Sequence, residues 1–265
     1  MAILRRIFNR LEYLNDKKYL NVLKTLYINF RYLPVLKAMK FPIYVYSGVR
    51  VRMNSGKIVF KSEIKSGMLK VGLPNYGAAC KRVNTIFNNQ GVIVVCGANI
   101  RIANGVELNI QSTGVLQLGS NVLIGECTRV VCANNIEMCS NVRVAHESQI
   151  IDTNFHYILN VDKNEIPNCS GSIFIASNNW IGNRSNINKG TKTAPYQIFS
   201  AGSLLNKDYE SYGEGCIFVG TPARLLGKGY FRVYDVNIDS DLRKYYKDHS
   251  DVYTINNKVK ELIIK

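Results

Sequence analysis

Hydrophobic residues in the middle of the chain recur at intervals of six. Cut at this interval from Val94, the sequence reads VVCGAN, IRIANG, VELNIQ, STGVLQ, LGSNVL, IGECTR, VVCANN, IEMCSN and VRVAHE, and every unit except the one at Ser112 begins with an aliphatic residue. After an interruption the pattern resumes at Ile175 with IASNNW and IGNRSN. A period of six fits neither an α-helix nor an alternating strand. It predicts a coil that turns one corner per unit and buries one aliphatic residue on each face, in a core shared with the neighbouring coils.

The same pattern divides the chain into regions. Residues 43–92 alternate like strands but lose the phase, and we expect them to form irregular first coils. Ahead of them, apolar residues at helical spacing predict one amphipathic helix over residues 1–14 and another from about Tyr19 to Tyr32, ended by Pro34. The expected organisation is a basic helical region over residues 1–42, a β-helical domain over residues 43–228 with a loop excursion at residues 148–172, and a tail over residues 229–265.

Charge is distributed unevenly along the 265 residues. The net charge of +15 comes almost wholly from residues 1–82, which hold 17 Lys and Arg against three Asp and Glu. A basic segment of this kind attracts anions such as lipid headgroups or polyanionic glycans, and we expect no nucleic-acid partner. Two interpretations are open for the helices within residues 1–40: peripheral contact with an anionic membrane surface, or packing on the protein itself with a solvated basic face.

Cysteine usage and hydropathy favour the cytoplasm. The seven cysteines are scattered and form no C-x-x-C pair, which is typical of reduced thiols rather than of a disulfide framework. The longest apolar stretches, such as GVIVVCG, are too short to span a bilayer, and no secretory signal follows the first basic residues. We therefore expect a cytoplasmic protein, with peripheral contact at the inner face of the membrane as one option.

Several motifs of catalysis and cofactor binding do not occur in the sequence. It has no G-x-S-x-G nucleophile elbow, no Walker loop and no Rossmann fingerprint. Its histidines are His146, His156 and His249, and the last lies in the polar tail. We therefore expect no metal, because a three-histidine site would need all of them around one coil.

The second block of units carries the most specific motifs. NNWIGNRSNINKG, FSAGSLLNKD and FVGTPARLLGK follow one another within residues 178–228. Together with the repeat, they make residues 94–228 resemble the hexapeptide-repeat acyltransferases, especially the galactoside, maltose and xenobiotic acetyltransferases and related polysaccharide O-acetyltransferases. The resemblance implies a left-handed parallel β-helix, acetyl-coenzyme A as the donor, and a homotrimer with its sites in clefts between neighbouring subunits.

The resemblance assigns catalysis to His156. This residue stands in NFHYI, within the stretch that breaks the repeat, where the family carries its catalytic histidine on a loop excursion. An imidazole titrates near neutral pH, so it can take the proton of a sugar hydroxyl while the oxygen attacks the thioester. Asp152 is the nearest acidic residue in the sequence, and we place it at the acceptor side or mouth of the site.

The resemblance also implies a donor site in the second block. The residues expected to contact coenzyme A are Asn183, Ala201, Gly202, Asn206, Lys207 and Arg224. Small residues such as Ala201 leave the backbone open to the amides of the pantetheine arm. Lys207 would face a phosphate, and Arg224 would approach the adenosine 3′-phosphate, for which a guanidinium is a natural partner.

Two residues allow two interpretations each. Trp180, in NNWIGN, packs either at the mouth of the site or in the core. His146 occupies a fifth position where small residues are the rule, so it is either a neighbour of the active site or, as we favour, a hydrogen-bonded structural residue.

The expected function is transfer of an acetyl group from acetyl-coenzyme A directly to a sugar hydroxyl of a bacterial surface polysaccharide or its lipid-linked precursor. One alternative is an acetyltransferase acting on an amino sugar or another small molecule. The other is a non-catalytic β-helix that serves as a binding or scaffold protein. The presence of His156, Lys207 and Arg224 favours an enzyme.

Overall fold

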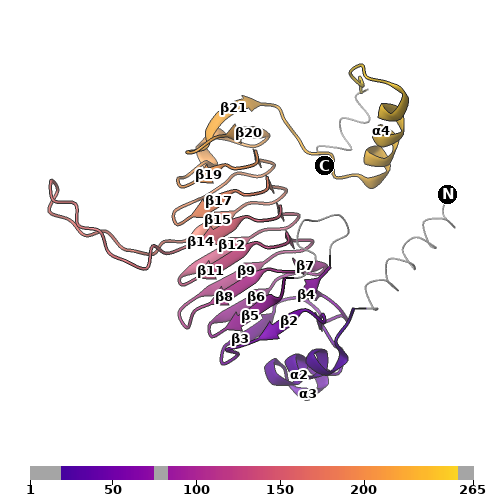
Figure 1. Ribbon diagram of the computed structural model, residues 1–265, viewed down its shortest axis with the longest axis vertical. Coiled ribbons are helices and arrows are strands. Elements are labelled where there is room, and N and C mark those ends of the chain that lie inside the picture. Colours follow the sequence, from indigo (N-terminus) through magenta and orange to yellow (C-terminus); the bar gives the residue numbers. More distant parts are fainter. Residues whose placement is uncertain (1–18, 75–82, 256–265) are drawn as a thin grey trace.

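The computed structural model describes residues 19–74 and 83–255 of the chain (Figure 1). Most of the molecule is an elongated stack of short strands, with two helices at one end, a long arm leaving one side, and a further helix near the C-terminus. The amphipathic helix expected over residues 1–14 lies outside the described residues.

The strands form three sheets, and along most of the stack each sheet receives every third strand of the chain. A chain that visits three sheets in turn, and then returns to the first one strand further along, winds a coil with three faces. The described strands are parallel throughout, apart from the β20–β21 hairpin. The predicted fold class, a left-handed parallel β-helix, is confirmed.

The three sheets are numbered by the order in which the chain enters them. Sheet 1 contains, in spatial order, β1 (Ile43–Val45), β4 (Leu69–Leu73), β7 (Ile100–Ala103), β10 (Leu123–Ile124), β13 (Arg143–Val144), β16 (Trp180–Ile181), β18 (Ile198–Phe199), β20 (Cys216–Val219) and β21 (Arg224–Lys228). Sheet 2 contains β2 (Val49–Val51), β5 (Thr85–Asn89), β8 (Glu107–Ile110), β11 (Arg129–Cys132), β14 (Gln149–Ile151), β17 (Asn186–Asn188) and β19 (Leu204–Leu205). Sheet 3 contains β3 (Lys57–Phe60), β6 (Val92–Val95), β9 (Val115–Leu118), β12 (Asn135–Met138) and β15 (Ile173–Ile175). The bends between them are called corner 1–2, corner 2–3 and corner 3–1.

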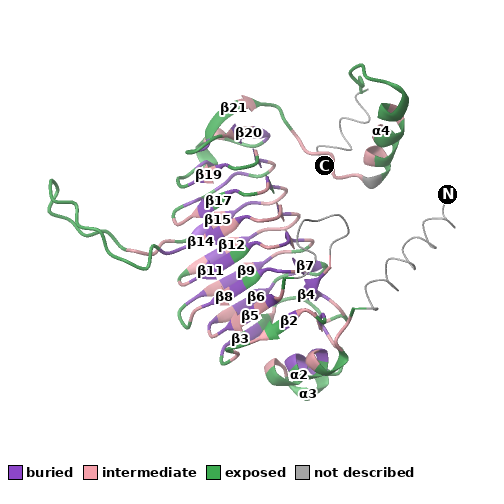
Figure 2. Ribbon diagram, viewed as in Figure 1, coloured by how far each residue is buried: buried purple, intermediate pink, exposed green. Residues whose placement is uncertain are grey.

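The core is a set of aliphatic columns that run the length of the stack (Figure 2). In sheet 2, one such column consists of five residues in register on consecutive coils, all with 0% exposure: Leu108, Val130, Ile150, Ile187 and Leu205. Because side chains alternate along a strand, their chain neighbours point outward. Each buried aliphatic residue contributes about 1.5–3 kcal/mol relative to an exposed one, which explains why one appears in each repeat unit.

The coils before Val94 belong to the same stack, although the sequence loses its phase there. Between β4 and β7 the register shifts from Val71 to Leu73. Gly72 lies at this shift with φ +79°, and a Cβ on it would lie 2.4 Å from the Cγ2 atom of Val49. Only glycine adopts this conformation readily. This local bulge is one part of the irregularity expected for the first coils. The larger part is coil length, because in-register residues of sheet 1 lie 26 and 31 residues apart in the first two coils (Ile43 to Leu69, Leu69 to Ile100) but 20 apart from Leu123 to Arg143.

Helix α2 (Val22–Tyr32) covers the outer edge of β1, the first strand of sheet 1. The side chain of Asn29, which is fully buried, donates to the carbonyl of Ile43 at 2.7 Å and accepts from its amide at 3.2 Å. The amide of Val45 donates to the hydroxyl oxygen of Thr25 at 3.1 Å. Side chains of α2 thus take the place of a neighbouring strand for β1, whose backbone groups would otherwise be unpaired at the sheet edge.

The apolar side of α2 faces outward. Asn21 caps the helix by accepting from the Lys24 amide at 2.9 Å, so the helix begins two to three residues later than expected. The apolar residues predicted to share one side are exposed in this helix: Leu23, Leu26, Tyr27 and Phe30. Helix α3 (Val35–Ala38) adds exposed Val35 and Leu36. Most of this stripe faces solvent, although the Tyr27 hydroxyl accepts a hydrogen bond from the Asn54 side chain of the β-helix at 2.6 Å. Packing on the protein itself, one of the two interpretations, therefore holds for this helix only in part.

Asparagines stack at corner 3–1. Asn99, Asn121, Asn141 and Asn178 occupy the same position on consecutive coils, with φ between +57° and +63°. Each side-chain amide donates to the carbonyl oxygen of the next asparagine, at 2.8, 2.8 and 2.9 Å. Asparagine tolerates the left-handed conformation better than most residues. Tyr196 takes the position on the following coil with φ +58°, so the corner keeps its shape there.

Aromatic side chains close the C-terminal end of the core. Phe199 and Phe218 stack with ring centroids 4.9 Å apart, and Tyr209 meets both rings edge-on. The short helix η1 (Glu210–Tyr212) precedes β20. Beyond β21 the tail leads into α4 (Val236–Asp248), which is capped by Asp235.

The cysteines differ from the expectation at one position. The described free cysteines are Cys96, Cys132, Cys139, Cys169 and Cys216. Cys127 is disulfide-bonded, so the expectation of fully reduced thiols is wrong for it. No helix in the described ranges is long and apolar enough to cross a membrane.

Candidate active site

An arm formed by residues 153–170 leaves the stack at corner 2–3 (Figure 1). A bridge between Thr153 and Ser170 closes its base, and Asn160 and Glu165 exchange backbone hydrogen bonds of 2.8 and 3.2 Å near its tip. Its apolar side chains are each more than half exposed: Phe155, Tyr157, Ile158, Leu159, Val161 and Ile166. A two-stranded excursion is marginally stable by itself, so this arm needs a surface on which to pack.

His156 lies on the arm and is exposed to solvent. It follows Phe155, which adopts φ +62° with its amide donating to the Thr153 hydroxyl at 3.0 Å. Within the described residues, the imidazole makes no hydrogen bond. A general base needs a partner that fixes its tautomer and orientation. The chain alone therefore presents His156 without orienting it.

Asp152 is fully buried at the base of the arm. Its Oδ1 accepts from the amide of Ala133 at 2.7 Å, and its Oδ2 accepts from the amide of Asn134 at 2.8 Å. Burial, followed by this carboxylate, raises the pKa of the adjacent Cys132 thiol. The position expected at the mouth of the site is thus occupied by a carboxylate that ties two neighbouring coils together. Both of its oxygens are engaged away from His156.

Replacement of Asp152 with alanine is expected to lower the free energy of unfolding by about 2–4 kcal/mol, because two backbone amides lose a charged acceptor and the buried site of the carboxylate is left unfilled. Thermal unfolding followed by circular dichroism measures this, with Asp162→Ala on the exposed arm as the matched control. A normal melting temperature combined with lost activity would instead assign Asp152 to the chemistry.

Corner 1–2 places four candidate residues in one column. The amide of Glu147 donates to the carbonyl of Glu126 at 2.7 Å. On the next coil the amide of Arg184 donates to the carbonyl of His146 at 3.0 Å, and on the coil after that the amide of Gly202 donates to the carbonyl of Asn183 at 2.9 Å. The equivalent positions on consecutive coils are therefore Glu126, His146, Asn183 and Ala201.

An ion pair lies beside this column. Arg184 Nε is 2.5 Å from Glu147 Oε2, and the hydrogen bond from Arg184 lowers the pKa of the Glu147 carboxyl. His146 Nδ1 is 3.9 Å from the same oxygen and, in the described part of the chain, has no hydrogen-bond partner although it is buried. The interpretation of His146 as a hydrogen-bonded structural residue is therefore wrong for this ring nitrogen, and the residue lies next to the predicted donor site.

The end of corner 1–2 is open and lined by small residues. Ala201 and Gly202 are exposed, and a Cβ on Gly202 would meet nothing within 4 Å. Beneath them, a Cβ on Gly182 would lie 2.5 Å from the Ala201 amide nitrogen, so glycine permits the close stacking of these coils. Thr221 donates to the Gly202 carbonyl at 3.1 Å, which positions the β20–β21 hairpin with exposed Arg224 above the same corner.

Asn206 and Lys207 lie at corner 2–3, the corner from which the arm departs on an earlier coil. Both are exposed. Lys207 Nζ donates to the Tyr212 hydroxyl at 3.3 Å and lies 5.3 Å from the centre of the Tyr209 ring. These contacts hold the ammonium group at the surface of the last coils.

Trp180 opens β16 with its side chain on the outer side of sheet 1. It is 40% exposed, which excludes the core interpretation. The guanidinium of Arg232, from the tail, lies 5.0 Å from the indole centre and 4.9 Å from the Tyr234 ring. The Tyr234 hydroxyl donates to the Asn178 carbonyl at 3.0 Å, and burial raises its pKa. The tail therefore forms one wall beside Trp180.

The single chain brings some of the expected site residues together and separates others. Asn183, Ala201 and Gly202 share corner 1–2, beneath the hairpin of Arg224, whereas the arm of His156 leaves from corner 2–3. One face of about six residues, or about 15–20 Å, separates the two corners. No group of three His, Cys, Asp or Glu side chains in the described ranges is arranged to hold a metal ion.

Sequence reasoning favoured a structural role for His146 over a place beside the site, and it did not identify Arg232. The sequence could have placed His146 beside the donor site, because Val144-Ala145-His146 and Ile181-Gly182-Asn183 occupy the same three positions of consecutive coils. Arg232 had no such signal, since no repeat extends into the tail.

Comparison with solved structures identifies the same fold elsewhere. NeuO, described as a polySia specific acetyltransferase, superimposes with a TM-score of 0.51 at 15% identity, over 78% of this chain and 88% of its own. OatWY, a polysialic acid O-acetyltransferase, gives 0.44 at 19% identity over 76% and 97%. A hexapeptide-repeat acetyltransferase from Vibrio cholerae in complex with acetyl coenzyme A gives 0.37 at 22% over 43% and 60%. No family model and no curated protein matches the chain. The likeness to NeuO shows that the fold is shared.

Proposed function

We propose that the protein is an acetyl-coenzyme A-dependent O-acetyltransferase that modifies a sugar hydroxyl of a bacterial surface polysaccharide or of its lipid-linked precursor. The observation that carries the proposal is the arm, which interrupts a regular stack and exposes His156 without an orienting hydrogen bond from residues 19–74 or 83–255. The shared fold with NeuO, whose described activity is acetyl transfer to a glycan, supports the reaction class.

In the proposed reaction, His156 acts as the general base. Its imidazole takes the proton of the acceptor hydroxyl as that oxygen forms a bond with the thioester carbonyl carbon. The tetrahedral intermediate then collapses, the carbon–sulfur bond breaks, and the departing thiolate of coenzyme A takes the proton back from the imidazolium. Transfer is direct, so no acyl-enzyme is needed.

The donor would lie along corner 1–2. Exposed Ala201 and Gly202 leave backbone groups accessible to the amides of the pantetheine arm, and Asn183 adds a polar side chain on the preceding coil. Arg224 and Lys207 are exposed cations at the same end of the stack and would face phosphates. Asn206 would add a polar contact beside Lys207.

A second copy of the chain would complete the site. The arm projects from one corner, the donor residues occupy another, and the exposed apolar side chains of the arm need a surface. In a cyclic homotrimer each arm would reach corner 1–2 of the neighbouring subunit, where its apolar side chains would be covered and His156 would meet the donor residues, and the ring of three subunits would close. Each of the three equivalent sites then combines His156 of one subunit with Ala201 and Gly202 of the next.

The test of the reaction is release of free coenzyme A thiol from acetyl-coenzyme A in the presence of candidate oligosaccharides, with mass spectrometry of the product. Acetyl esters on sugar hydroxyls are the expected result. Acetamides on amino sugars, or transfer to small non-sugar acceptors only, would favour the alternative enzymes. No transfer and no thioester hydrolysis with any acceptor would favour a scaffold protein.

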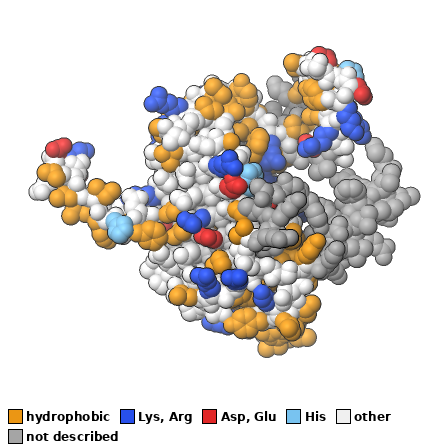
Figure 3. All heavy atoms as spheres, in the orientation of Figure 1, with side chains coloured by type: hydrophobic (Ala, Val, Ile, Leu, Met, Phe, Trp, Pro, Cys, Tyr) orange, Lys and Arg blue, Asp and Glu red, His pale blue; other side chains and the backbone are white. Residues whose placement is uncertain are grey.

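We also propose that the α2–α3 end of the stack docks on the inner face of the membrane. Exposed apolar side chains gather there, among them Leu23 and Leu36 at 79% and 81% exposure. Exposed Arg31, Lys37 and Lys40 lie among them, and no Asp or Glu occurs between Asp16 and Glu63 (Figure 3). An apolar surface edged by cations fits an anionic lipid surface, at roughly 1 kcal/mol per basic residue near the headgroups.

A double variant, Leu23→Ser with Leu36→Ser, is expected to weaken binding to phosphatidylglycerol vesicles at low salt at least about tenfold, because two leucines no longer enter the interface. Co-sedimentation measures this, and rising ionic strength should release the wild-type protein. Val252→Ser, which alters an exposed valine of the tail, is the control. Equal binding of the double variant and the wild type would refute the docking surface.

A further inference from the structure

Sheet 1 carries an unusual set of outward-facing side chains. Its strands contain no Asp or Glu, whereas sheets 2 and 3 contain Glu107 and Glu137. Arg129, one of the outward arginines of sheet 2, is paired with Glu107 at 2.9 Å. The arginines of sheet 1 have no such acidic neighbour on their own sheet.

The outward residues of sheet 1 form an unbroken column. The strand register aligns, in order, Tyr44, Lys70, Arg101, Leu123, Arg143 and Trp180. Five spacings of about 4.8 Å make this column about 24 Å long. An aromatic ring stands at each end, and three cationic side chains lie between them.

The cations near Trp180 lack a neutralising partner within the described residues. Arg101 Nε donates to the neutral Asn99 side chain at 3.1 Å, and Arg143 donates to the backbone and side chain of Asn121. Arg232 lies over the Trp180 ring. Burial, and after it the charges of Arg232 and Arg101, lower the pKa of the Arg143 guanidinium. A bound anion would relieve this repulsion.

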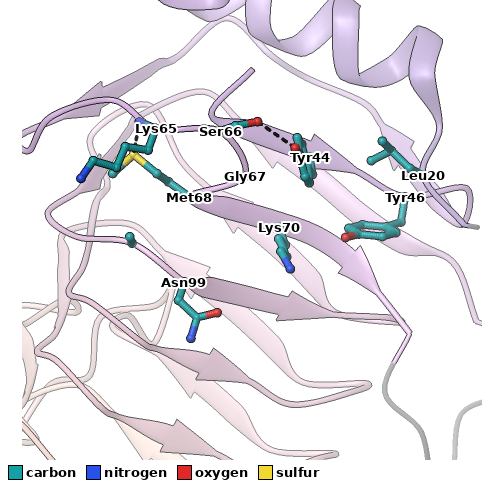
Figure 4. A pocket seen from close by; sticks show the side chains of 10 residues that line it. Leu20, Tyr44, Tyr46, Lys65, Ser66, Gly67, Met68, Lys70 and Asn99 are labelled. Carbon is teal, nitrogen blue, oxygen red and sulfur yellow. Dashed lines mark hydrogen bonds between the residues drawn. The ribbon is translucent and has the colours of Figure 1, made fainter. Parts of the chain in front are cut away.

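The other end of the column lies in a pocket of about 440 Å³ (Figure 4). Tyr44 projects into it from β1, with Lys65, Lys70 and Asn99 around it, while Tyr46, which is 1% exposed, forms part of the wall. The Tyr44 hydroxyl is 2.7 Å from the Ser66 hydroxyl, which holds the ring in place. Aromatic faces pack against the C–H groups of sugar rings, and lysines accommodate their acidic substituents.

We propose that this column, from Tyr44 through Arg101 and Arg143 to Trp180 with Arg232, is the binding tract for a carboxylate-bearing polysaccharide acceptor. The assignment rests on the proposed function for its link to catalysis, because Trp180 is the residue expected at the mouth of the site. An extended glycan lies along the column, its carboxylates pair with guanidinium groups, and aromatic rings support sugars at the two ends. Periodic charges on a rigid β-helix suit a polymer better than a single sugar.

The test is equilibrium binding of the full-length protein, without acetyl-coenzyme A, to hexagalacturonate and to a hyaluronan hexasaccharide, with neutral maltohexaose for comparison. At least one acidic probe is expected to bind more tightly than maltohexaose, and to weaken as salt rises. The double variant Arg101→Gln with Arg232→Gln should lower that affinity at least about tenfold, since each arginine loses a charge-assisted contact.

Arg50→Gln is the control, because Arg50 is an exposed arginine on sheet 2 and undergoes the same change of side chain away from the column. It should bind the acidic probe like the wild type. Circular dichroism and light scattering check that the double variant keeps its fold and its assembly.

Two results overturn the tract: neither acidic probe binding better than the neutral one, or the double variant binding the acidic probe like Arg50→Gln. Loss of coenzyme A affinity in the double variant with unchanged glycan affinity would assign the arginines to the donor instead. Dissociation of the assembly would assign the column to a subunit interface. If acidic glycans bind but no acetyl group is transferred, the binding tract is supported and the proposed function is refuted. If only neutral glycans are acetylated, the proposed function is supported and the tract is refuted.

Discussion

The His156→Ala variant is expected to fold normally and to lose at least about 100-fold in turnover number, the lower end of what a positioned general base contributes. Because His156 is exposed on the arm, the change should leave the fold intact. Steady-state release of coenzyme A thiol, with acceptor at saturation, measures the loss. The Michaelis constant for acetyl-coenzyme A should change little, since donor contacts lie at corner 1–2.

Two further histidine variants decide what the loss means. His249→Ala makes the same chemical change on the exposed tail and should retain full turnover. His146→Ala removes the half-exposed ring beside Glu147, whose buried Nδ1 atom has no hydrogen-bond partner in the described residues. If His146→Ala loses 100-fold or more, on the same scale as a general base, while His156→Ala stays active, the base sits at corner 1–2 and the assignment to the arm is wrong.

Mixed oligomers are expected to recover activity from two inactive variants. Ala201→Trp fills the open end of corner 1–2 and should block the donor, whereas His156→Ala removes the base. If each site takes its arm from one subunit and its corner from the next, random mixing leaves both parts intact at about one site in four. Tandem purification with two affinity tags removes the unmixed trimers, and each cyclic trimer that contains both variants has one intact site in three. Co-expression should therefore restore about a third of wild-type activity, from a starting level of about 1% or less.

The control for mixing pairs His156→Ala with a chain that carries both substitutions. No site in such an oligomer contains an intact arm, so activity should stay at the level of the single variant. Doubly tagged oligomers of the two single variants that remain inactive would show that each site is built within one chain. Light scattering of a stable, fully active monomer would have the same consequence.

Sequence predicted the coils well because their core depends on short-range periodicity. Ile150 and Ile187 fall in register despite the arm between them, since each unit must bury its own aliphatic residue. The phase failed before Val94, where the first coils are longer than the later ones and the bulge at Gly72 shifts the register as well, while the strands still pair. Alternation alone does not reveal such an insertion.

Sequence predicted less of the site, because a site depends on which corner each residue occupies. The motif around Ala201 and Gly202 marked an open corner correctly, but Asp152 could be taken for a mouth residue since its burial depends on amides of the previous coil. The sequence also did not show that the apolar side chains of α2 face outward. Thr25 and Asn29 bind β1 through polar groups, which no hydrophobic pattern records.

The hydrogen bonds between α2 and β1 also explain why the stack of coils ends at β1. A parallel β-helix has no intrinsic length, and an uncovered terminal coil presents the same backbone array that templates growth in cross-β fibrils. Asn29 and Thr25 occupy the acceptors and donors of Ile43 and Val45 with side chains that cannot be extended into another strand. The helix therefore prevents a further coil from pairing with β1, so that a fold that could repeat without limit stays finite at this end.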